Sequence, residues 1–376
     1  MGIIFIIGVV QAFFIEFILL TKRRKSLPDK ILAIWIFILG LHLFLYYLDY
    51  TGFYQSYPHL QGLMVPLPLV HGPLMLVYLT SLINKNQTIN RLLWLNFIPT
   101  FLFYLYLVPR LLLTKQGLLY WIQGAELDPP IIFLIFSISI DISGPVYILW
   151  SLLLLRRHRK GIGENFSFTE KINLNWLRNI IVGMAIIWSV VLIANLMDSK
   201  TGPTLVYAAV TLFVFLIGYY GIRQGVIFTD ARGPEEKADP IHKPKYEKSA
   251  LKEDQAGKYY QDLLEHMKDN KPYLESKITL PQLAGEMKLN PNYVSQVIND
   301  SFGQNFYDFI NSYRVEEFKR RLNTKTAPNY TLLAHGLDSG FSSKSSFNEV
   351  FKKFTSQTPS QYFRNLRATG EQSDLE

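Results

Sequence analysis

Long apolar runs dominate the chain up to about residue 222, whereas from Arg223 onward charged residues recur every few positions. A helix needs about 20 mostly apolar residues to cross the hydrocarbon core of a bilayer, and seven segments reach or approach that length. They are residues 3–20, 31–48, 63–83, 92–113, 131–155, 179–197 and 203–222. The pattern predicts an all-α chain in which residues 1–222 form a seven-helix transmembrane bundle.

The basic residues between these runs predict the orientation of the bundle. Loops 21–30, 84–91 and 156–178 carry five, two and six Lys or Arg, whereas loops 49–62, 110–130 and 198–202 carry none, two and one. Basic loops stay in the cytoplasm. We therefore expect a multi-pass protein of the cell inner membrane, with its N-terminus outside and its C-terminal part cytoplasmic. The first run lacks a cleavage site and is read as a retained span.

Composition narrows the chemistry without identifying it. The formal net charge is +8, of which +6 falls in residues 1–242 and +2 in residues 243–376, so the basic excess alone does not indicate DNA binding. The absence of cysteine excludes disulfides, thiolate zinc sites and cysteine nucleophiles. No Gly-rich phosphate loop, HExxH or GxSxG motif occurs, so we expect no enzyme and no cofactor.

Four ionisable residues inside the apolar runs are candidates for sensing a ligand or a proton, because such residues are costly in a membrane. They are Glu16, His42, His71 and Asp141. The alternative is that they form interhelical hydrogen bonds which fix the packing of the bundle. A metal site is compatible with the residue types, but nothing fixes their distances, and we predict none.

Two connecting segments carry weaker signals. Residues 223–257 mix charge with repeated proline, which is typical of a solvated cytoplasmic linker. The outer loop 114–130, with Tyr120, Trp121, Glu126 and Asp128, is either a lid over an outward site or an interfacial aromatic anchor, and the anchor is favoured.

Residues 279–302 predict two short helices joined by a tight turn. Thr279 can cap a helix from Leu280 to Met287, and Asn290 can cap a second helix with Pro291 at its first position. Such a pair is typical of a helix-turn-helix unit. The outward residues of its second helix are polar and suited to reading bases or phosphates: Asn292, Tyr293, Ser295, Gln296 and Asn299.

The same pattern recurs downstream. A helix from Thr331 to Ser339 ends at Gly340, and a second helix runs from Ser343 to Phe354. The candidate DNA-contacting residues of this second helix are Ser343, Lys344, Ser345, Ser346, Asn348, Lys352 and Lys353. One long helix, Asn305 to Leu322, lies between the units and has aromatic residues available to hold both.

Several blocks in order resemble the DNA-binding domain of AraC/XylS-type regulators over residues 258–366. The blocks are Lys271-Pro272-Tyr273-Leu274, Tyr313-Arg314-Val315-Glu316-Glu317 with Lys319-Arg320, Ser339-Gly340-Phe341, Phe347, Phe351-Lys352-Lys353 and Thr358-Pro359-Ser360-Gln361-Tyr362. The resemblance implies that the two units enter successive major grooves of double-stranded promoter DNA. It also implies that Arg314 helps to hold the units together and that Gly340, Phe341, Phe347, Phe351 and Pro359 are structural.

The chain departs from that pattern at a few packing positions. His335 and Gly336 stand where the family usually has an apolar residue and alanine, Phe318 stands where alanine is common, and Ser356 falls near an expected glycine. These departures concern local stability more than DNA contact. Residues 367–376 are expected to form a disordered tail.

Taken together, the two halves resemble membrane-bound AraC-type regulators. The leading hypothesis is a one-component sensor in which a small-molecule or envelope signal, perceived by the bundle among membrane lipid, alters promoter binding. Because a flexible linker transmits bend and twist poorly, control through proximity or a homodimer is favoured. The alternative is an intramembrane enzyme or transporter with a regulatory DNA-binding tail.

Overall fold

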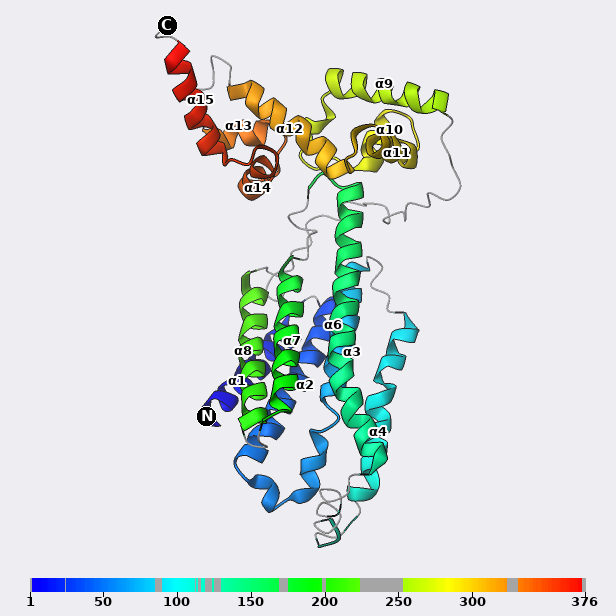
Figure 1. Cartoon of the computed structure of the whole chain (residues 1–376), viewed down its shortest axis with the longest axis vertical. Coiled ribbons are helices and arrows are strands. Elements are labelled where there is room, and N and C mark those ends of the chain that lie inside the picture. The colour runs from blue at the N-terminus through cyan, green and yellow to red at the C-terminus, as the bar shows by residue number, and fades with distance from the viewer. Residues whose placement is uncertain are drawn as a thin grey trace. The chain divides into compact units, whose positions relative to one another are not determined.

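The computed structural model describes residues 2–23, 25–84, 90–111, 113, 116–118, 124, 130–168, 175–197, 201–223, 253–322 and 331–373. These residues form helices and no strand (Figure 1). The chain divides into two compact units. The first contains residues 1–156 and 174–237, and the second contains residues 157–173 and 238–376. The second unit therefore includes a short segment that precedes the last two helices of the first.

The first unit consists of apolar helices. Its α-helices are α1 (Gly2–Thr21), α2 (Leu27–Tyr50), α3 (Pro68–Ile83), α4 (Ile98–Leu111), α6 (Ile131–Asn165, whose end lies in the second unit), α7 (Asn175–Ala194) and α8 (Thr201–Arg223). Three 3-10 segments, Phe53–Gln55, Pro58–Leu63 and Arg91–Phe97, precede α3 and α4. Side chains from α1, α2, α3, α7 and α8 share one core.

Six helices of the described residues are long and apolar enough to cross a membrane, counting Arg91–Pro109 as one. The remaining expected span, residues 63–83, is shorter than the sequence predicted. It contains a helix of only 16 residues, Pro68–Ile83. Proline lacks the N–H that a helix interior uses, so Pro68 fits at the first turn and the residues before it form turns instead. The residues Tyr120, Trp121, Glu126 and Asp128 of the outer loop lie outside the described residues.

Glycines allow close approach between helices in this unit. A Cβ built on Gly144 of α6 would lie 2.0 Å from the ring of Trp188 on α7, and one on Gly72 of α3 would lie 2.5 Å from the ring of Tyr147 on α6. Small residues at helix contacts are typical of membrane bundles, where packing replaces the hydrophobic effect as the force that joins helices.

The second unit is built from helices on either side of one long helix. They are α9 (Glu253–Asp269), α10 (Leu280–Glu286), α11 (Pro291–Phe302), α12 (Phe306–Leu322), α13 (Leu332–Asp338), α14 (Lys344–Thr355) and α15 (Pro359–Ser373), with a 3-10 turn at Pro272–Leu274. One core joins α9, α10, α11 and the first half of α12, and another joins the second half of α12 to α14. The long helix therefore contributes to both cores, as the sequence predicted.

The unusual residues at packing positions fit one another. Phe318 is fully buried, with its ring centroid 4.7 Å from that of Phe347 and 5.2 Å from that of Phe351. Gly336 faces the same Phe347 ring, and a Cβ at residue 336 would lie 2.9 Å from it. A large side chain on α12 is thus matched by the smallest one on α13, which keeps the core filled without overpacking.

The ends of the second unit differ from the expected boundaries. Helix α9 begins at Glu253, before the expected start at residue 258, and α15 continues to Ser373 although residues 367–376 were expected to be disordered. Thr358 and Gln361 form reciprocal hydrogen bonds at the start of α15, with Pro359 in its first turn, and this local signal starts a helix of four turns. Residues 224–252 of the expected linker lie outside the described residues.

Candidate DNA-binding surface and buried polar centres

Helices α10 and α11 form the first helix pair around a tight turn. The Thr279 side chain accepts a hydrogen bond from the backbone N–H of Gln282, whose own side chain accepts one from the N–H of Thr279. Lys288 adopts a left-handed conformation with φ of 55°, and Asn290 caps α11. These capping bonds satisfy backbone groups at both helix starts and fix where α11 begins.

The polar residues of α11 are not equally available. Asn292 is exposed, whereas the other four predicted contact residues are half-buried. The Asn299 amide donates to the Ser295 carbonyl at 2.8 Å, and the Tyr293 ring stacks on Tyr259 of α9 at 6.1 Å. Asn292, at the N-terminal end of the helix, is therefore the best-placed of the five to meet a partner.

Helices α13 and α14 form the second pair. Thr331 caps α13 and Ser343 caps α14, each through its side-chain oxygen. Between the two helices Gly340 has a φ of +94°, which a residue with a Cβ rarely adopts. Five predicted contact residues are exposed on α14: Lys344, Ser345, Asn348, Lys352 and Lys353.

The outward placement expected for Ser346 is wrong. The structure buries Ser346 to 6% exposure. Residues four apart share one face of a helix, and Ser346 lies four residues before the buried Val350, so it belongs to the inward stripe. Ser343 is half-buried and is used as a cap, so it too contributes more to the start of α14 than to an outer surface.

The lysines of α14 also differ in their surroundings. Lys353 pairs with Asp308 of α12 at 2.5 Å and lies over the Tyr307 ring, so it joins α14 to the long helix. Lys344 and Lys352 have no ion-pair partner among the residues that the structure describes. Two unneutralised cations, one at each end of α14, favour a polyanion over an acidic side chain of the same chain.

Arg314 is the polar centre of the second unit. The side chain is 1% exposed and lies in the middle of α12. Its Nε donates to the carbonyl of Tyr273 at 2.8 Å, and Nη2 donates to the carbonyl of Glu275 at 2.8 Å. Nη1 and Nη2 also reach the carbonyl and hydroxyl of Ser167, each at 3.1 Å. Burial lowers the pKa of Arg314 to about 10, so the guanidinium stays charged at neutral pH.

The other predicted structural residues surround this centre or the second core. A Cβ at Gly340 would lie 2.2 Å from the carbonyl oxygen of Tyr273, so only glycine allows the α13–α14 turn to approach the 3-10 turn at Pro272–Leu274. Phe341, Phe347, Phe351 and Pro359 are buried, as expected for structural roles.

In the first unit the structure brings together two of the four candidate sensing residues. His42 of α2 and His71 of α3 are both buried, and His42 Nδ1 lies 3.1 Å from His71 Nε2. The hydroxyl of Tyr207, on α8, lies 2.7 Å from the other nitrogen of His42. The remaining nitrogen of His71, Nδ1, is buried and has no hydrogen-bond partner in the described part of the chain. Three helices thus meet at a polar centre in which one buried ring nitrogen, His71 Nδ1, has no hydrogen-bond partner among the described residues.

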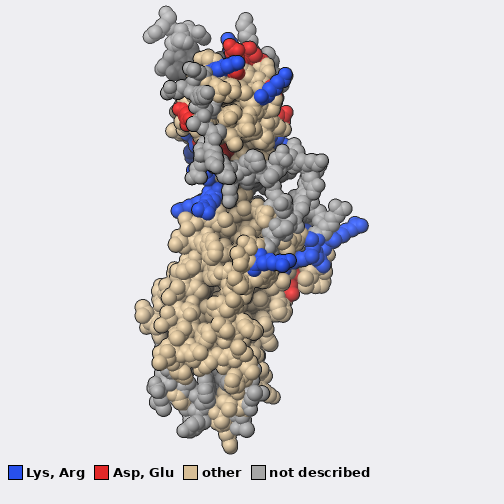
Figure 2. Space-filling view, turned by 90° about the vertical axis from the view of Figure 1, so that its right-hand side faces the viewer, with Lys and Arg blue, Asp and Glu red and all other residues tan. Residues whose placement is uncertain are grey.

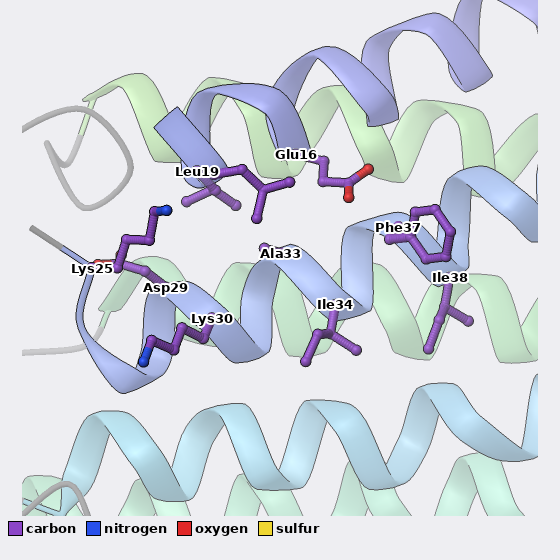
Figure 3. Close-up of a pocket in the computed structure, with 10 residues that line it drawn as sticks. Glu16, Leu19, Lys25, Asp29, Lys30, Ala33, Ile34, Phe37 and Ile38 are labelled. Atoms are coloured by element: carbon purple, nitrogen blue, oxygen red, sulfur yellow. The ribbon is translucent and has the colours of Figure 1, made fainter. Parts of the chain in front are cut away.

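The other two candidates lie elsewhere. Asp141 of α6 accepts a hydrogen bond from Asn195 at 3.1 Å. Glu16 lines a pocket between α1 and α2 (Figure 3) together with Leu19, Leu20, Lys25, Asp29, Lys30, Ala33, Ile34, Phe37 and Ile38. No group of three or more His, Cys, Asp or Glu among the described residues is arranged to hold a metal ion.

Sequence reasoning missed two residues of these centres. Tyr207 lies within an apolar run that contains other tyrosines, and its sequence position does not show that it meets His42. Ser167 lies just after α6, 147 residues before Arg314. No local pattern marks either contact, because both depend on how distant helices pack.

Comparison with known proteins identifies the C-terminal part. Residues 283–365 match the helix-turn-helix domain family. Over 90 residues, 24% of this chain, the sequence is 33% identical to uncharacterized HTH-type transcriptional regulators of Staphylococcus aureus strains COL and MSSA476. The match spans 12% of the length of those relatives. A protein of unknown function from Listeria innocua is similar over 28% of this chain and 93% of its own, with 28% identity and a TM-score of 0.24. The C-terminal part of the chain is therefore an AraC-type helix-turn-helix domain, homologous to part of HTH-type transcriptional regulators.

Proposed function

We propose that the chain is a membrane-bound transcription regulator that binds promoter DNA through α11 and α14 and responds to a signal perceived in its apolar helices. The observation that carries the proposal is the pair of similarly capped helices, α11 and α14, each preceded by a short helix and a tight turn and each packed on the single helix α12. Two such helices on one support can enter successive major grooves.

The exposed side chains of α11 and α14 include uncharged ones suited to base edges and charged ones suited to phosphates. Asn292, Ser345 and Asn348 are uncharged and exposed near the N-terminal ends or along the outer faces of their helices, where base edges are read. Lys344 and Lys352 supply charge for phosphates. The partial positive charge of the helix starts, at Asn290 and Ser343, adds to the attraction for the DNA backbone.

The surface of the first unit fits membrane lipid. Helix α6 exposes a continuous apolar stripe of residues three or four apart: Ile131, Ile135, Ile138, Ile142, Val146, Leu149 and Leu153. Figure 2 shows a largely uncharged surface on this unit, with Lys and Arg gathered at one end. A soluble protein rarely exposes so large an apolar area, whereas acyl chains would cover it.

The proposed orientation has the N-terminus outside the inner membrane and the helix-turn-helix domain in the cytoplasm. Support comes from residues 157–173, which belong to the second unit and fall within the basic loop 156–178. A basic loop is retained on the cytoplasmic side by its charge, and in this chain it belongs to the same compact unit as the helix-turn-helix domain.

The signal is proposed to act on the polar centre of His42, His71 and Tyr207. The unused Nδ1 of the buried His71 offers a hydrogen bond to a small polar ligand or a position for a proton. Because the centre joins α2, α3 and α8, occupancy would alter how these helices pack.

The experiment that tests the proposal uses the full chain reconstituted in lipid nanodiscs. Chromatin captured with the tagged full-length chain supplies the DNA, and binding to that DNA is measured by fluorescence anisotropy at several salt concentrations. We expect Lys344→Ala to weaken binding by about 1 kcal/mol and to reduce the salt dependence. Lys268→Ala, which removes an exposed lysine from α9, is the matched control and should leave both unchanged. Equal binding to captured and scrambled DNA would refute the proposal.

A further inference from the structure

A short segment at the end of α6 is part of the DNA-binding unit. Helix α6 runs without interruption from Ile131 to Asn165, yet its residues up to Arg156 belong to the first unit and those from Arg157 belong to the second. The chain thus passes between the two units after residues 156 and 173 as well as in the expected linker at residues 223–257. The connection at residue 156 lies within a helix.

Ser167, directly after this helix, is bound on every polar atom. The residue is fully buried. Its backbone N–H and its hydroxyl donate to the carbonyl of Ile278, at 3.3 and 2.7 Å. Its carbonyl accepts from Asn311 at 3.2 Å and from Arg314 at 3.1 Å, and its hydroxyl oxygen accepts from Arg314 at 3.1 Å. The segment therefore completes the hydrogen bonding of Arg314.

The neighbours of Ser167 extend the same contact. Phe166 is 6% exposed and forms an antiparallel bridge with Thr279, the cap of α10. Gly163, on the last turns of α6, faces the side chain of Asn305, whose oxygen accepts from the N–H of Asp308 at the start of α12. The end of α6 thus contacts the starts of α10 and α12, the two helices that position α11.

We propose that the DNA-binding domain docks on the end of α6 through Phe166 and Ser167, and that this docking, more than the linker, transmits the state of the membrane helices to α10, α11 and α12. The proposal rests on the proposed function as a membrane-bound regulator. A continuous helix carries rotation and displacement along its length, since each residue adds about 100° and 1.5 Å. The docked segment converts movement of α6 into movement of the helix pair that reads DNA.

Disulfide trapping in the full-length chain tests the docking without any DNA. The chain contains no cysteine, so an introduced pair is unique. Residues paired across an antiparallel bridge have Cα atoms roughly 4.5–5.5 Å apart, within the range of about 4.4–6.8 Å that a disulfide spans. Phe166→Cys with Thr279→Cys should therefore form a disulfide in native membranes under mild oxidation. Phe166→Cys with Lys344→Cys is the control pair and should stay reduced.

A second cysteine pair tests the docking if the Phe166→Cys substitution prevents the chain from folding. A Cβ at Gly163 has ordinary contacts with Asn305, the nearest of them 3.5 Å away, so Gly163→Cys with Asn305→Cys leaves the buried Phe166 in place. If both pairs remain reduced in chains that reach the membrane in normal amounts, the docking is absent and the proposal is wrong.

Insertions in the helix test the transmission. One alanine inserted between Arg157 and His158 rotates everything after it by about 100°, whereas seven alanines add nearly two whole turns and restore the direction. With a reporter driven by the captured DNA, the single insertion should change output at least about fivefold, the lower end of typical allosteric coupling, and the seven-residue insertion should reverse most of that change. One alanine inserted after Pro240, in the expected linker, should change little.

The two proposals fail in different ways. A disulfide that forms in a chain with no preference for captured DNA leaves the docking intact and overturns the regulatory function. Specific DNA binding with insertions at residues 157 and 240 of equal effect overturns transmission through α6 and leaves the regulatory function intact.

Discussion

Two buried polar centres in the described part of the chain differ in how completely they are hydrogen-bonded. In the second unit, Arg314 directs Nε, Nη1 and Nη2 to acceptors from two separate segments, the turn at Tyr273 and Glu275 and the segment at Ser167. In the first unit, His42 uses both ring nitrogens, but His71 leaves Nδ1 without a partner among the described residues. A fully bonded buried group fixes one structure, whereas an unpaired one carries a cost that a ligand or proton can relieve. We therefore expect the Arg314 centre to stabilise the fold, and the centre of His42, His71 and Tyr207 to respond to a signal.

Removal of the Arg314 side chain should have the largest effect on stability. Arg314→Ala leaves the carbonyls of Tyr273, Glu275 and Ser167 without their charged donor, and we expect a loss of about 3 kcal/mol or more. Hydrogen exchange of the full-length chain in micelles should show faster exchange throughout α12. Arg364→Ala, an exposed arginine on α15, should stay within about 0.5 kcal/mol of the original chain. Equal protection in the two variants would mean that Arg314 is not the structural centre.

Gly340→Ala should disrupt the same centre from the opposite side. The new Cβ would lie 2.2 Å from the Tyr273 carbonyl in a backbone conformation with φ of +94°, and we expect a cost of about 2 kcal/mol. Gly285→Ala is the matched control, because nothing lies within 4 Å of its Cβ and alanine favours the helix. Thermal unfolding that ranks the two variants in the opposite order would contradict the close approach.

Changes at the polar centre of His42, His71 and Tyr207 should affect signalling more than stability. Tyr207→Phe removes one hydroxyl and the 2.7 Å contact with His42, at a cost of about 1 kcal/mol. We expect it to shift reporter output, normalised to the amount of protein in the membrane. Tyr147→Phe also removes a hydroxyl, one that donates to Asn96 at 2.8 Å, and should leave output unchanged. If both variants alter output equally, the His42 centre has no special role and its bonds only hold the bundle together.

Acid should weaken the second unit slightly. Hydrogen bonding and ion pairing with Arg320, and pairing with Arg321, hold the pKa of Glu317 below its ordinary value of 4.5. A carboxylate with a lowered pKa contributes stability that is present above the unfolded value and is lost as pH falls through the folded one. Unfolding of the original chain should therefore become easier below about pH 4.5, and Glu317→Gln should flatten that dependence. A profile identical in both chains would show that another group is responsible.

The helix pairs of the second unit were predictable because their signals are local. Thr279 and Asn290 were expected to cap helices, and each directly precedes the helix start that the structure has. The helix expected to begin at Ser343, after a cap at Ser342, begins one residue later at Lys344, with Ser343 as its cap. Side-chain direction at helix ends was less predictable, since Ser346 was assigned to the outer face and lies on the inner one. One turn of periodic pattern contains too few residues to fix the face.

The polar centres were predictable only in part. An apolar run makes His42 and His71 stand out, so their importance could be inferred, but not that they touch each other while Asp141 pairs with Asn195. The role of Ser167 could not be inferred, because a serine in a polar loop carries no signal and its partners are far away in the chain. Contacts of this kind follow from packing between helices, which single-sequence patterns do not specify.

We propose that one chain binds promoter DNA while its apolar helices remain in the membrane. Capture of chromatin with the full-length chain from washed, detergent-free membranes tests this most directly, because it selects for membrane residence and DNA contact together. We expect enriched sites that share a sequence and that are depleted by Lys344→Ala but not by Lys268→Ala. Recovery of the intact chain in the soluble fraction, or membrane-bound chain without enriched DNA, would contradict it.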